Sequence, residues 1–338
     1  MKKSRRNAGV RLGIIHLALL FIFVCSVSGG RRDANAGQSS SETSTVAAYE
    51  ERITKGVKKG LIYECAIIIG QDNEVLFQKS YGQHMKKGGV FGHKKVPASL
   101  NAIYDLASVT KPVATATSIL VLVDMGKIRI KDKIVEFMPE FKGTDKEDIT
   151  VLQLLTHTSG FKYDTAHTKI PANQRFVKYA KSKTLSKSKN NKMSYSGVNF
   201  ALLQIIVERV SGETLDMFST KYVFTPLMMK DTMYNPPKTL MHRLAPNKNK
   251  DGSFVWGKSM AGMNKVTVSG GTGLFSTASD LARYCKMIIN QGELDGVRIL
   301  KKETCSRMIA EKMGWWYFAK DGQSVFHPGG TGNMIYIN

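Results

Sequence analysis

Hydrophobic positions after residue 45 first follow a helical period and then alternate with polar ones. A helix is predicted at 46–60, where apolar residues recur every three to four positions. Two strand-like runs follow at 61–70 and 74–82, separated by a short polar turn. The domain is therefore expected to begin with a helix and a β-hairpin.

Helical patterns fill the middle of the chain, and short strands close it. Helices are predicted at 109–126, 150–157, 198–210, 278–290 and 301–313. Strands are predicted at 315–320, 324–329 and 334–338. This order predicts an α+β fold, an α/β sandwich in which an antiparallel sheet is built from N- and C-terminal strands. Helices flank that sheet, and a helical subdomain is inserted between its two halves.

Residues 1–36 differ in character from the rest. Five basic side chains precede an apolar run at 12–27, and Ala-Asn-Ala at 34–36 is typical of a cleavage site. The run is shorter than the ~20 residues that span a bilayer comfortably. A signal peptide or N-terminal anchor is predicted, and export to the periplasm or beyond follows. Membrane attachment through 12–27 and lipidation at Cys25 remain alternatives.

The remaining chain divides into a linker and one folded domain. Residues 37–45 are rich in Ser, Thr and Gly and are predicted to be a solvated linker. The domain is assigned to 46–338, which is long enough to bury a large core. Three of the four cysteines follow residue 36, and an odd number cannot form a complete disulfide framework. Whether Cys285 pairs with Cys305 is left open.

Charge adds little to this picture. The formal net charge is +22, and 1–36 contributes seven basic and one acidic side chain, so the remainder carries +16. Much of that lies in a lysine-rich stretch at 178–193 with one interleaved aromatic residue. This pattern favours a solvated loop, or attraction to an anionic envelope polymer or substrate carboxylate, over nucleic-acid binding. No nucleic-acid partner is predicted.

The helix predicted at 109–126 carries a lysine at its entrance. Its apolar residues from Val113 occupy every face, as in a buried helix, and Pro112 places Ser108 and Lys111 in or just before the first turn. Desolvation would leave the Lys111 amine partly neutral and able to take a proton from Ser108. The alternative is that Ser108 caps the helix and Lys111 reaches solvent. Ser-x-x-Lys also occurs at Ser159 and Ser186, but neither opens a buried helix.

Five segments resemble motifs of one family. They are YDLASVTKPVATA (104–116), VLQLLTHTSG (151–160), YSGVNFALLQIIVERVSG (195–212), GGTGLFSTASDLARY (270–284) and HPGGTGN (327–333). In this order they resemble the serine β-lactamase and D-Ala-D-Ala peptidase superfamily, in its class C β-lactamase-like and esterase branch. The resemblance implies the β-lactamase/transpeptidase-like fold.

The resemblance also implies roles for single residues. Ser108 would be the nucleophile, Lys111 and Tyr195 would share the acid and base work, and His327 would occupy the third-motif position. The backbone N–H groups of Ser108 and Gly330 would form the oxyanion hole. Gly329 and Thr331 would contact substrate, and His157 would be structural. No cofactor is implied, and the histidine spacing suggests no metal site.

Two departures from the family pattern matter. Gly197 stands where relatives have an amide or acid in the tyrosine motif, although Asn199 matches the family's helix asparagine. Ester hydrolysis is therefore favoured over amide hydrolysis, unless another side chain substitutes. The family fold also continues beyond MIYIN (334–338) with a central strand and a helix. A fragment, or a damaged sheet with unpaired edges, is expected.

These observations lead to one functional expectation with alternatives. The chain is expected to be an exported serine hydrolase acting through a Ser108 acyl-enzyme. Its substrate would be a peptidoglycan-derived peptide, a β-lactam or a small ester. A module that is acylated without turnover, or an inactive truncated remnant of the family, are the alternatives.

Overall fold

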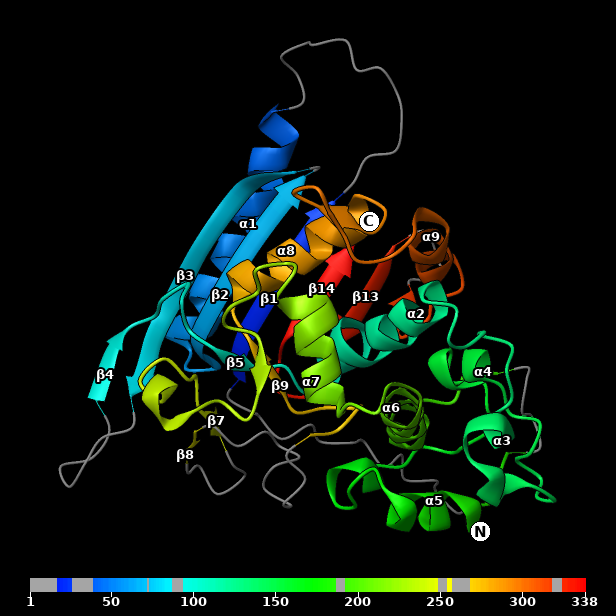
Figure 1. The fold of residues 1–338 in the computed structure, drawn as a ribbon. Helices are drawn as coiled ribbons and strands as arrows, with labels where there is room; N and C mark the ends of the chain where they lie inside the picture. Colours follow the sequence, from blue (N-terminus) through cyan, green and yellow to red (C-terminus); the bar gives the residue numbers. More distant parts are fainter. Residues whose placement is uncertain are drawn as a thin grey trace, which may run out of the picture.

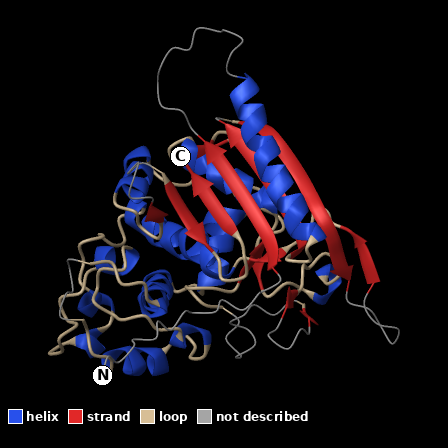
Figure 2. Ribbon diagram, turned by 180° about the vertical axis from the view of Figure 1, so that it is seen from behind, coloured by secondary structure: helices blue, strands red, loops and turns tan. Residues whose placement is uncertain are grey.

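The computed structural model describes residues 17–25, 39–71, 73–86, 94–186, 192–248, 254–256, 268–317 and 324–338. A sheet with a long helix on each face stands beside a region of shorter helices (Figures 1 and 2). Strands from both ends of the chain share this sheet. The predicted α+β organisation is therefore confirmed.

Within the described residues, seven strands form the main sheet. They are β1 (Leu17–Cys25), β2 (Ile62–Gln71), β3 (Glu74–Lys86), β4 (Lys94–Pro97), β12 (Trp316–Tyr317), β13 (Val325–Pro328) and β14 (Met334–Ile337). Their spatial order is β12-β13-β14-β1-β2-β3-β4. β1 runs parallel to both of its neighbours, and the other neighbouring pairs are antiparallel. The predicted hairpin of β2 and β3 and the predicted C-terminal strands are confirmed.

β2 is covered on both faces, which explains its continuous apolar run. Cys65 and Ile67 pack with Ile53 of helix α1 (Ser39–Lys58). Ala66 and Ile68 belong to the main core on the other face, where helix α8 (Ala278–Ile289) contacts β1 and β2. Burial on both faces removes the polar alternation of a half-exposed strand. Figure 1 shows α8 in front of the sheet, and Figure 2 shows α1 across its opposite face.

β1 fills the place where unpaired edges were expected. Phe21 to Val24 pair with Met334 to Ile337 of β14, and the opposite edge of β1 pairs along β2. The main-chain groups of both neighbouring edges are thereby satisfied, so the expectation of open edges is wrong. The predicted signal peptide or anchor includes β1 and stays a prediction, and its cleavage site at 34–36 lies outside the described residues.

The predicted linker differs from the structure. Its residues from Ser39 onward continue α1 toward the N-terminus. Adding residues to an existing helix requires no new nucleation, so polar residues can extend the helix that begins the folded domain. Composition alone had favoured a solvated coil there.

The described residues also contain several helices besides α1. They are α2 (Thr117–Asp124), α3 (Ile134–Phe137), α4 (Val151–Leu155), α5 (Gln174–Lys181), α6 (Gly197–Ser211), α7 (Leu215–Ser219), α8 and α9 (Lys302–Ala310). Shorter turns are η3 (Pro139–Phe141), η4 (Ala166–Thr168), η5 (Thr220–Phe224) and η6 (Lys238–Leu240). The helices predicted at 150–157, 198–210, 278–290 and 301–313 correspond to α4, α6, α8 and α9. Ser196 caps α6 by accepting from the Val198 N–H at 3.3 Å.

The helix predicted at 109–126 is built from three consecutive segments. They are η1 (Ala107–Val109), the π-helical η2 (Lys111–Ala116) and α2. Among the described residues, 107–124 is the segment long and apolar enough to cross a membrane, and 83% of it is buried inside the protein. Such burial matches the predicted core helix.

A second sheet positions the start of that helix. β5 (Tyr104–Asp105), β9 (Leu274–Ser276) and β6 (Met233–Tyr234) lie in the order β5-β9-β6. Because β9 pairs with β5, residues 270–273 lie beside the turn that carries Ser108. Two further strand pairs are β7 (Asn247–Lys248) with β8 (Phe254–Val255) and β10 (Glu293–Leu294) with β11 (Val297–Arg298).

The three cysteines of the described side chains are buried thiols. Cys65, Cys285 and Cys305 form no disulfide, and Cys305 Sγ donates to the Ile288 carbonyl at 3.5 Å. The pairing left open by the sequence is therefore absent, and burial raises the pKa of all three thiols. They behave as small core residues.

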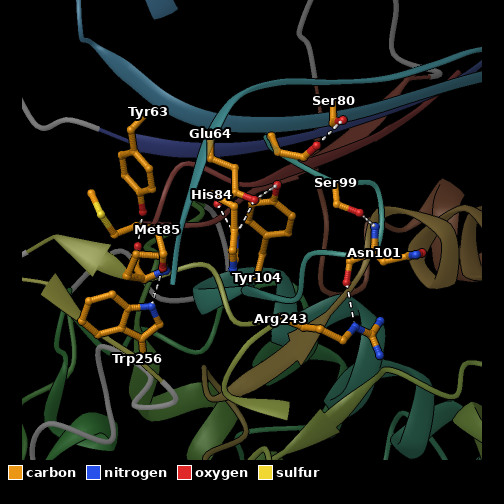
Figure 3. A network of polar contacts seen from close by, with 12 residues as sticks. Tyr63, Glu64, Ser80, His84, Met85, Ser99, Asn101, Tyr104, Arg243 and Trp256 are labelled. Atoms are coloured by element: carbon orange, nitrogen blue, oxygen red, sulfur yellow. Dashed lines mark hydrogen bonds and ion pairs between the residues drawn. The ribbon is translucent and has the colours of Figure 1, made fainter. Parts of the chain in front are cut away.

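A buried polar cluster joins the hairpin to β5 (Figure 3). The Glu64 carboxylate lies 2.9 Å from His84 Nδ1 and accepts from the Tyr104 hydroxyl at 3.3 Å. His84 Nε2 lies 3.2 Å from the His242 carbonyl. Glu64 is fully buried and His84 is 4% exposed. The cluster thus ties β2 and β3 to the strand that leads to Ser108.

Replacing His84 by leucine is expected to lower the free energy of unfolding by about 3–5 kcal/mol, since it strands a buried carboxylate. Urea unfolding followed by circular dichroism measures this. The double variant Glu64→Leu/His84→Leu should recover much of the loss. Lys79→Leu, which breaks the exposed Lys79–Glu50 pair, is the control and should be close to neutral. Equal losses of unfolding free energy in His84→Leu and Lys79→Leu would contradict the conclusion that the buried contact between His84 and Glu64 stabilises the fold.

Candidate active site

Ser108 lies on a strained turn directly after β5. The preceding residue, Ala107, has a φ of +45°, which is unusual for a residue with a side chain. The Asp105 carboxylate accepts from the Ala107 N–H at 3.0 Å, and Leu106 N–H donates to the Leu274 carbonyl at 2.9 Å. Strain held in place by surrounding bonds is common where a turn must present one side chain.

Lys111 lies beside Ser108, as the sequence predicted. Its Nζ is 3.2 Å from Ser108 Oγ and donates to the Gly271 carbonyl at 2.7 Å. The side chain is fully buried, and this burial lowers the pKa of Lys111 to about 7. Near neutral pH a large share of the amine is therefore unprotonated and can accept a proton.

Tyr195 contacts the same hydroxyl from another element. Its OH donates to Ser108 Oγ at 2.8 Å, and its ring centroid lies 4.9 Å from Lys111 Nζ. Burial raises the pKa of Tyr195 to about 12. The phenol thus keeps its proton at neutral pH and can supply it to a neighbouring atom. The structure brings Ser108, Lys111 and Tyr195 together.

The ring of His157 packs against the ring of Tyr195. The two ring centroids are 4.7 Å apart. His157 Nδ1 accepts from Ser196 N–H at 3.2 Å and from Asn199 Nδ2 at 2.8 Å, while Asn199 Oδ1 accepts from Ser159 Oγ at 2.6 Å. These contacts agree with the structural role expected for His157. The Ser159 hydroxyl, which begins the second Ser-x-x-Lys pattern, is occupied by the bond to Asn199.

His327 of β13 also reaches this group. Its ring centroid lies 6.3 Å from that of Tyr195, and its Nδ1 donates to the Pro328 carbonyl at 2.9 Å. Burial, reinforced by Lys111, lowers the pKa of His327 to about 3. Its Nε2 is buried without a hydrogen-bond partner among the described residues. His327 is therefore a neutral imidazole with a free acceptor at neutral pH.

The turn between β13 and β14 lies against the Ser108 turn. A Cβ at Gly329 would come within 2.4 Å of the Leu106 carbonyl oxygen, so only glycine permits this approach. A Cβ at Gly330 would meet nothing within 4 Å. The Gly330 N–H is used by none of the backbone hydrogen bonds of the described turns.

Thr331 lies in the turn between β13 and β14. Its hydroxyl donates to the Asp105 carbonyl at 2.6 Å and accepts from Asn333 Nδ2 at 2.9 Å. The side chain is buried and fastens the β13–β14 turn to β5. The substrate contact expected from the motif stays a prediction, and here the hydroxyl donates to the main chain.

Three neighbours of this site were missed by the sequence reasoning. Trp316 packs 5.5 Å from the Tyr195 ring, Gly271 supplies the carbonyl that binds Lys111, and His167 fills space over Gly197. Gly271 lies in the family motif at 270–284, and this motif could have indicated its place in the site. The other two depend on how distant segments fold together. Among the described residues, no three His, Cys, Asp or Glu side chains are grouped to hold a metal ion.

Comparison with known proteins gives a consistent picture. The model of the Beta-lactamase family matches residues 50–338. A protein of Escherichia coli (strain K12), provisionally named a D-alanyl-D-alanine carboxypeptidase, is 28% identical over 271 residues. The alignment covers 70% of this chain and 62% of that protein, so the chain spans less than two thirds of this relative.

Solved structures share the fold. A penicillin-binding protein homologue from Pyrococcus abyssi, described as octameric, superposes with a TM-score of 0.70 at 23% identity, covering 85% of this chain and 68% of that chain. D-alanine carboxypeptidase AmpC from Burkholderia cenocepacia gives 0.63 at 22% identity, covering 86% and 76%. At these identities the likeness concerns the fold.

Proposed function

Because the chain belongs to the Beta-lactamase family, we propose that it is a serine hydrolase that forms an acyl-enzyme on Ser108. The observation that carries the proposal is the convergence of two groups on one hydroxyl. Lys111 Nζ lies at 3.2 Å and Tyr195 OH at 2.8 Å from Ser108 Oγ. One neighbour can take a proton near neutral pH and the other can give one.

Acylation begins with proton transfer from Ser108 to Lys111. As the neutral amine takes the proton, Ser108 Oγ bonds to the substrate carbonyl carbon, and the carbonyl electron pair moves to oxygen. The Ser108 and Gly330 N–H groups stabilise the resulting oxyanion. The bond to the leaving group then breaks, Tyr195 gives its proton to that group, and Lys111 returns a proton to Tyr195.

Hydrolysis of the acyl-enzyme repeats these proton transfers, with water as the nucleophile in place of Ser108. The water loses a proton to a basic group of the site as it attacks the acyl carbon, and Ser108 recovers its proton when the ester bond breaks. His327 is neutral and offers an acceptor to bound substrate beside Tyr195. Gly329 lets the substrate-facing turn approach the nucleophile closely.

The proposed substrates are peptides that end in D-Ala-D-Ala. The name of the Escherichia coli relative supports this class, and the net charge of +16 after residue 36 suits a substrate with a free carboxylate. Small esters are the second candidate, favoured by Gly197, and β-lactams are a third class to test. Export is supported by the apolar N-terminal run. Residues 17–25 of that run form β1 in this structure, so cleavage or membrane attachment of the run would take β1 out of the sheet.

The proposal is tested by measuring product release from three substrates: a D-Ala-D-Ala peptide, a chromogenic β-lactam and a p-nitrophenyl ester. Ser108→Ala is the control for each substrate. Turnover of any of them that Ser108→Ala lacks supports a serine hydrolase, and the ratio of rates assigns the substrate. A burst of one equivalent without turnover would point instead to a module that is acylated but does not hydrolyse. Absence of both from folded protein would contradict the proposal.

The pH dependence of acylation follows from Lys111. Only the neutral amine accepts the Ser108 proton, so the acylation rate is expected to rise with pH through about 7, the pKa set by burial. It should then stay level until Tyr195 begins to ionise, toward about 12. Pre-steady-state acylation between pH 5 and 9 measures the rise. A rate that falls as pH increases through 7 would exclude Lys111 as the base.

A further inference from the structure

The ring of His167 occupies the space of two missing side chains. His167 belongs to η4 (Ala166–Thr168) and is 6% exposed. A Cβ at Gly197 would lie 1.8 Å from His167 Nδ1, and a Cβ at Gly271 would lie 2.4 Å from its Cδ2. Both distances are far below van der Waals contact. The imidazole therefore requires glycine at both positions.

Each of these two glycines adjoins a proposed catalytic side chain. Gly197 follows Tyr195 by two residues and begins α6. The Gly271 carbonyl accepts the 2.7 Å hydrogen bond from Lys111 Nζ. The His167 ring thus lies between the tyrosine segment and the carbonyl that orients the lysine.

The loop that carries His167 is fastened to the same segment. Gly197 N–H donates to the Asp164 carbonyl at 2.9 Å. The Asp164 carboxylate accepts from Ala166 N–H at 2.7 Å and from Tyr179 OH at 2.5 Å. These bonds fix η4 from both sides. The position of the ring is therefore determined by the fold.

The electrostatic surroundings keep this ring neutral. Burial and the nearby Lys111 lower the pKa of His167 to about 3, although Asp164 acts in the opposite direction. His157 and His327 also face Lys111 and are neutral for the same reasons. Lys111 is thus surrounded by imidazoles and the Tyr195 ring, and no carboxylate of the described residues raises its pKa. An ionised acid at 197 would do so.

We propose that His167 is a positioning residue of the acyl-transfer site, which replaces the side chain missing at Gly197 by a ring from another segment. The ring packs against Gly271, fixes the carbonyl that binds the Lys111 amine, and excludes water from that amine. It acts through Lys111 and takes no part in the bond changes. The inference rests on the proposed function of Ser108 and Lys111.

The consequence of removing the ring is a hydrated lysine. In His167→Ala, water enters beside Gly271, the ammonium form is better solvated, and the pKa of Lys111 moves up toward its ordinary value. The midpoint of the rise in acylation rate with pH is expected to move up by about one unit or more. At pH 7 the neutral fraction of the amine then falls from about one half to about one tenth, so the rate should fall about fivefold or more. A residue that only supports the fold would lower the rate without moving this midpoint.

An exchange of side chains tests whether His167 stands in for residue 197. Gly197→Asn alone should disable the site, because its Cβ collides with the ring. The double variant His167→Ala/Gly197→Asn removes the collision and refills the volume from the tyrosine segment. It is expected to recover most of the rate at pH 7 and a midpoint near that of the wild type. His242→Ala, at an exposed histidine, serves as the control and should match the wild type.

The experiment measures the rate at which a serine-reactive phosphonate ester labels Ser108 in the full chain, from pH 5 to 9. If the wild type is not labelled, the proposed function fails and this inference fails with it. If it is labelled and His167→Ala keeps the same rate and midpoint, the positioning role alone is overturned. If His167→Ala does not fold, the double variant decides. A folded double variant with the wild-type midpoint supports the exchange, and one that is inactive, unfolded or shifted in midpoint overturns it.

Discussion

Replacing Ser108 by alanine is expected to reduce turnover of any substrate by about 10⁴- to 10⁶-fold, as loss of a nucleophile does in serine hydrolases. The strained turn at Ala107 and the contacts from Lys111 and Tyr195 present this hydroxyl and no other. Steady-state turnover of the best substrate class measures the loss. Binding should be nearly unchanged, because the hydroxyl is small and its neighbours Lys111 and Tyr195 stay in place.

Ser186→Ala is the matched control for this variant. Ser186 begins another Ser-x-x-Lys pattern but lies on a loop, where its N–H donates to the Gly160 carbonyl. Its turnover should stay within a few fold of the wild type. Comparable losses in Ser108→Ala and Ser186→Ala would mean that neither serine acts as the nucleophile.

Replacing Lys111 by methionine is expected to slow acylation by about 10²- to 10⁴-fold, the usual contribution of a general base. Methionine has a similar length and no proton acceptor of comparable strength, so the rise in rate through pH 7 should disappear as well. Stopped-flow acylation across the pH range measures both effects. Lys127→Met, at an exposed lysine, is the control and should keep the wild-type profile.

The same variant has a second expected effect, on stability. The folded protein lowers the pKa of Lys111 from 10.5 to about 7, so the unfolded chain binds an additional proton between these values. This binding favours unfolding, most strongly at low pH, and the effect fades as pH rises toward 10.5. Lys111→Met should therefore unfold at a higher temperature than the wild type, by more at pH 6 than at pH 9. A lower unfolding temperature at pH 6 would contradict the burial of an uncompensated amine.

The sequence was sufficient for the central part of the site. An apolar helix with Pro112 near its start places Ser108 and Lys111 three residues apart on one face, so their proximity was predictable from local geometry. The tyrosine motif then indicated Tyr195, and the structure puts its hydroxyl 2.8 Å from Ser108 Oγ. The core helices and the hairpin were predictable because hydrophobic period is a local property of the chain.

The sequence did not predict how segments far apart in the chain pack against one another. Thr331 belongs to a motif that suggested a substrate contact, but its hydroxyl direction depends on the approach of β5. His167 carries no local signal, because its role depends on the coincidence of two glycines from other segments. β1 has the composition of an exported leader, and only pairing with β14 and β2 makes it a strand.

The most direct test of the central claim is the intact mass of the purified chain after exposure to a serine-reactive phosphonate ester. We expect one adduct per chain, absent from Ser108→Ala and retained by Ser186→Ala. That result would establish Ser108 as an activated nucleophile in an assembled site. An adduct that persists in Ser108→Ala, or no adduct on a folded wild-type chain, would contradict it.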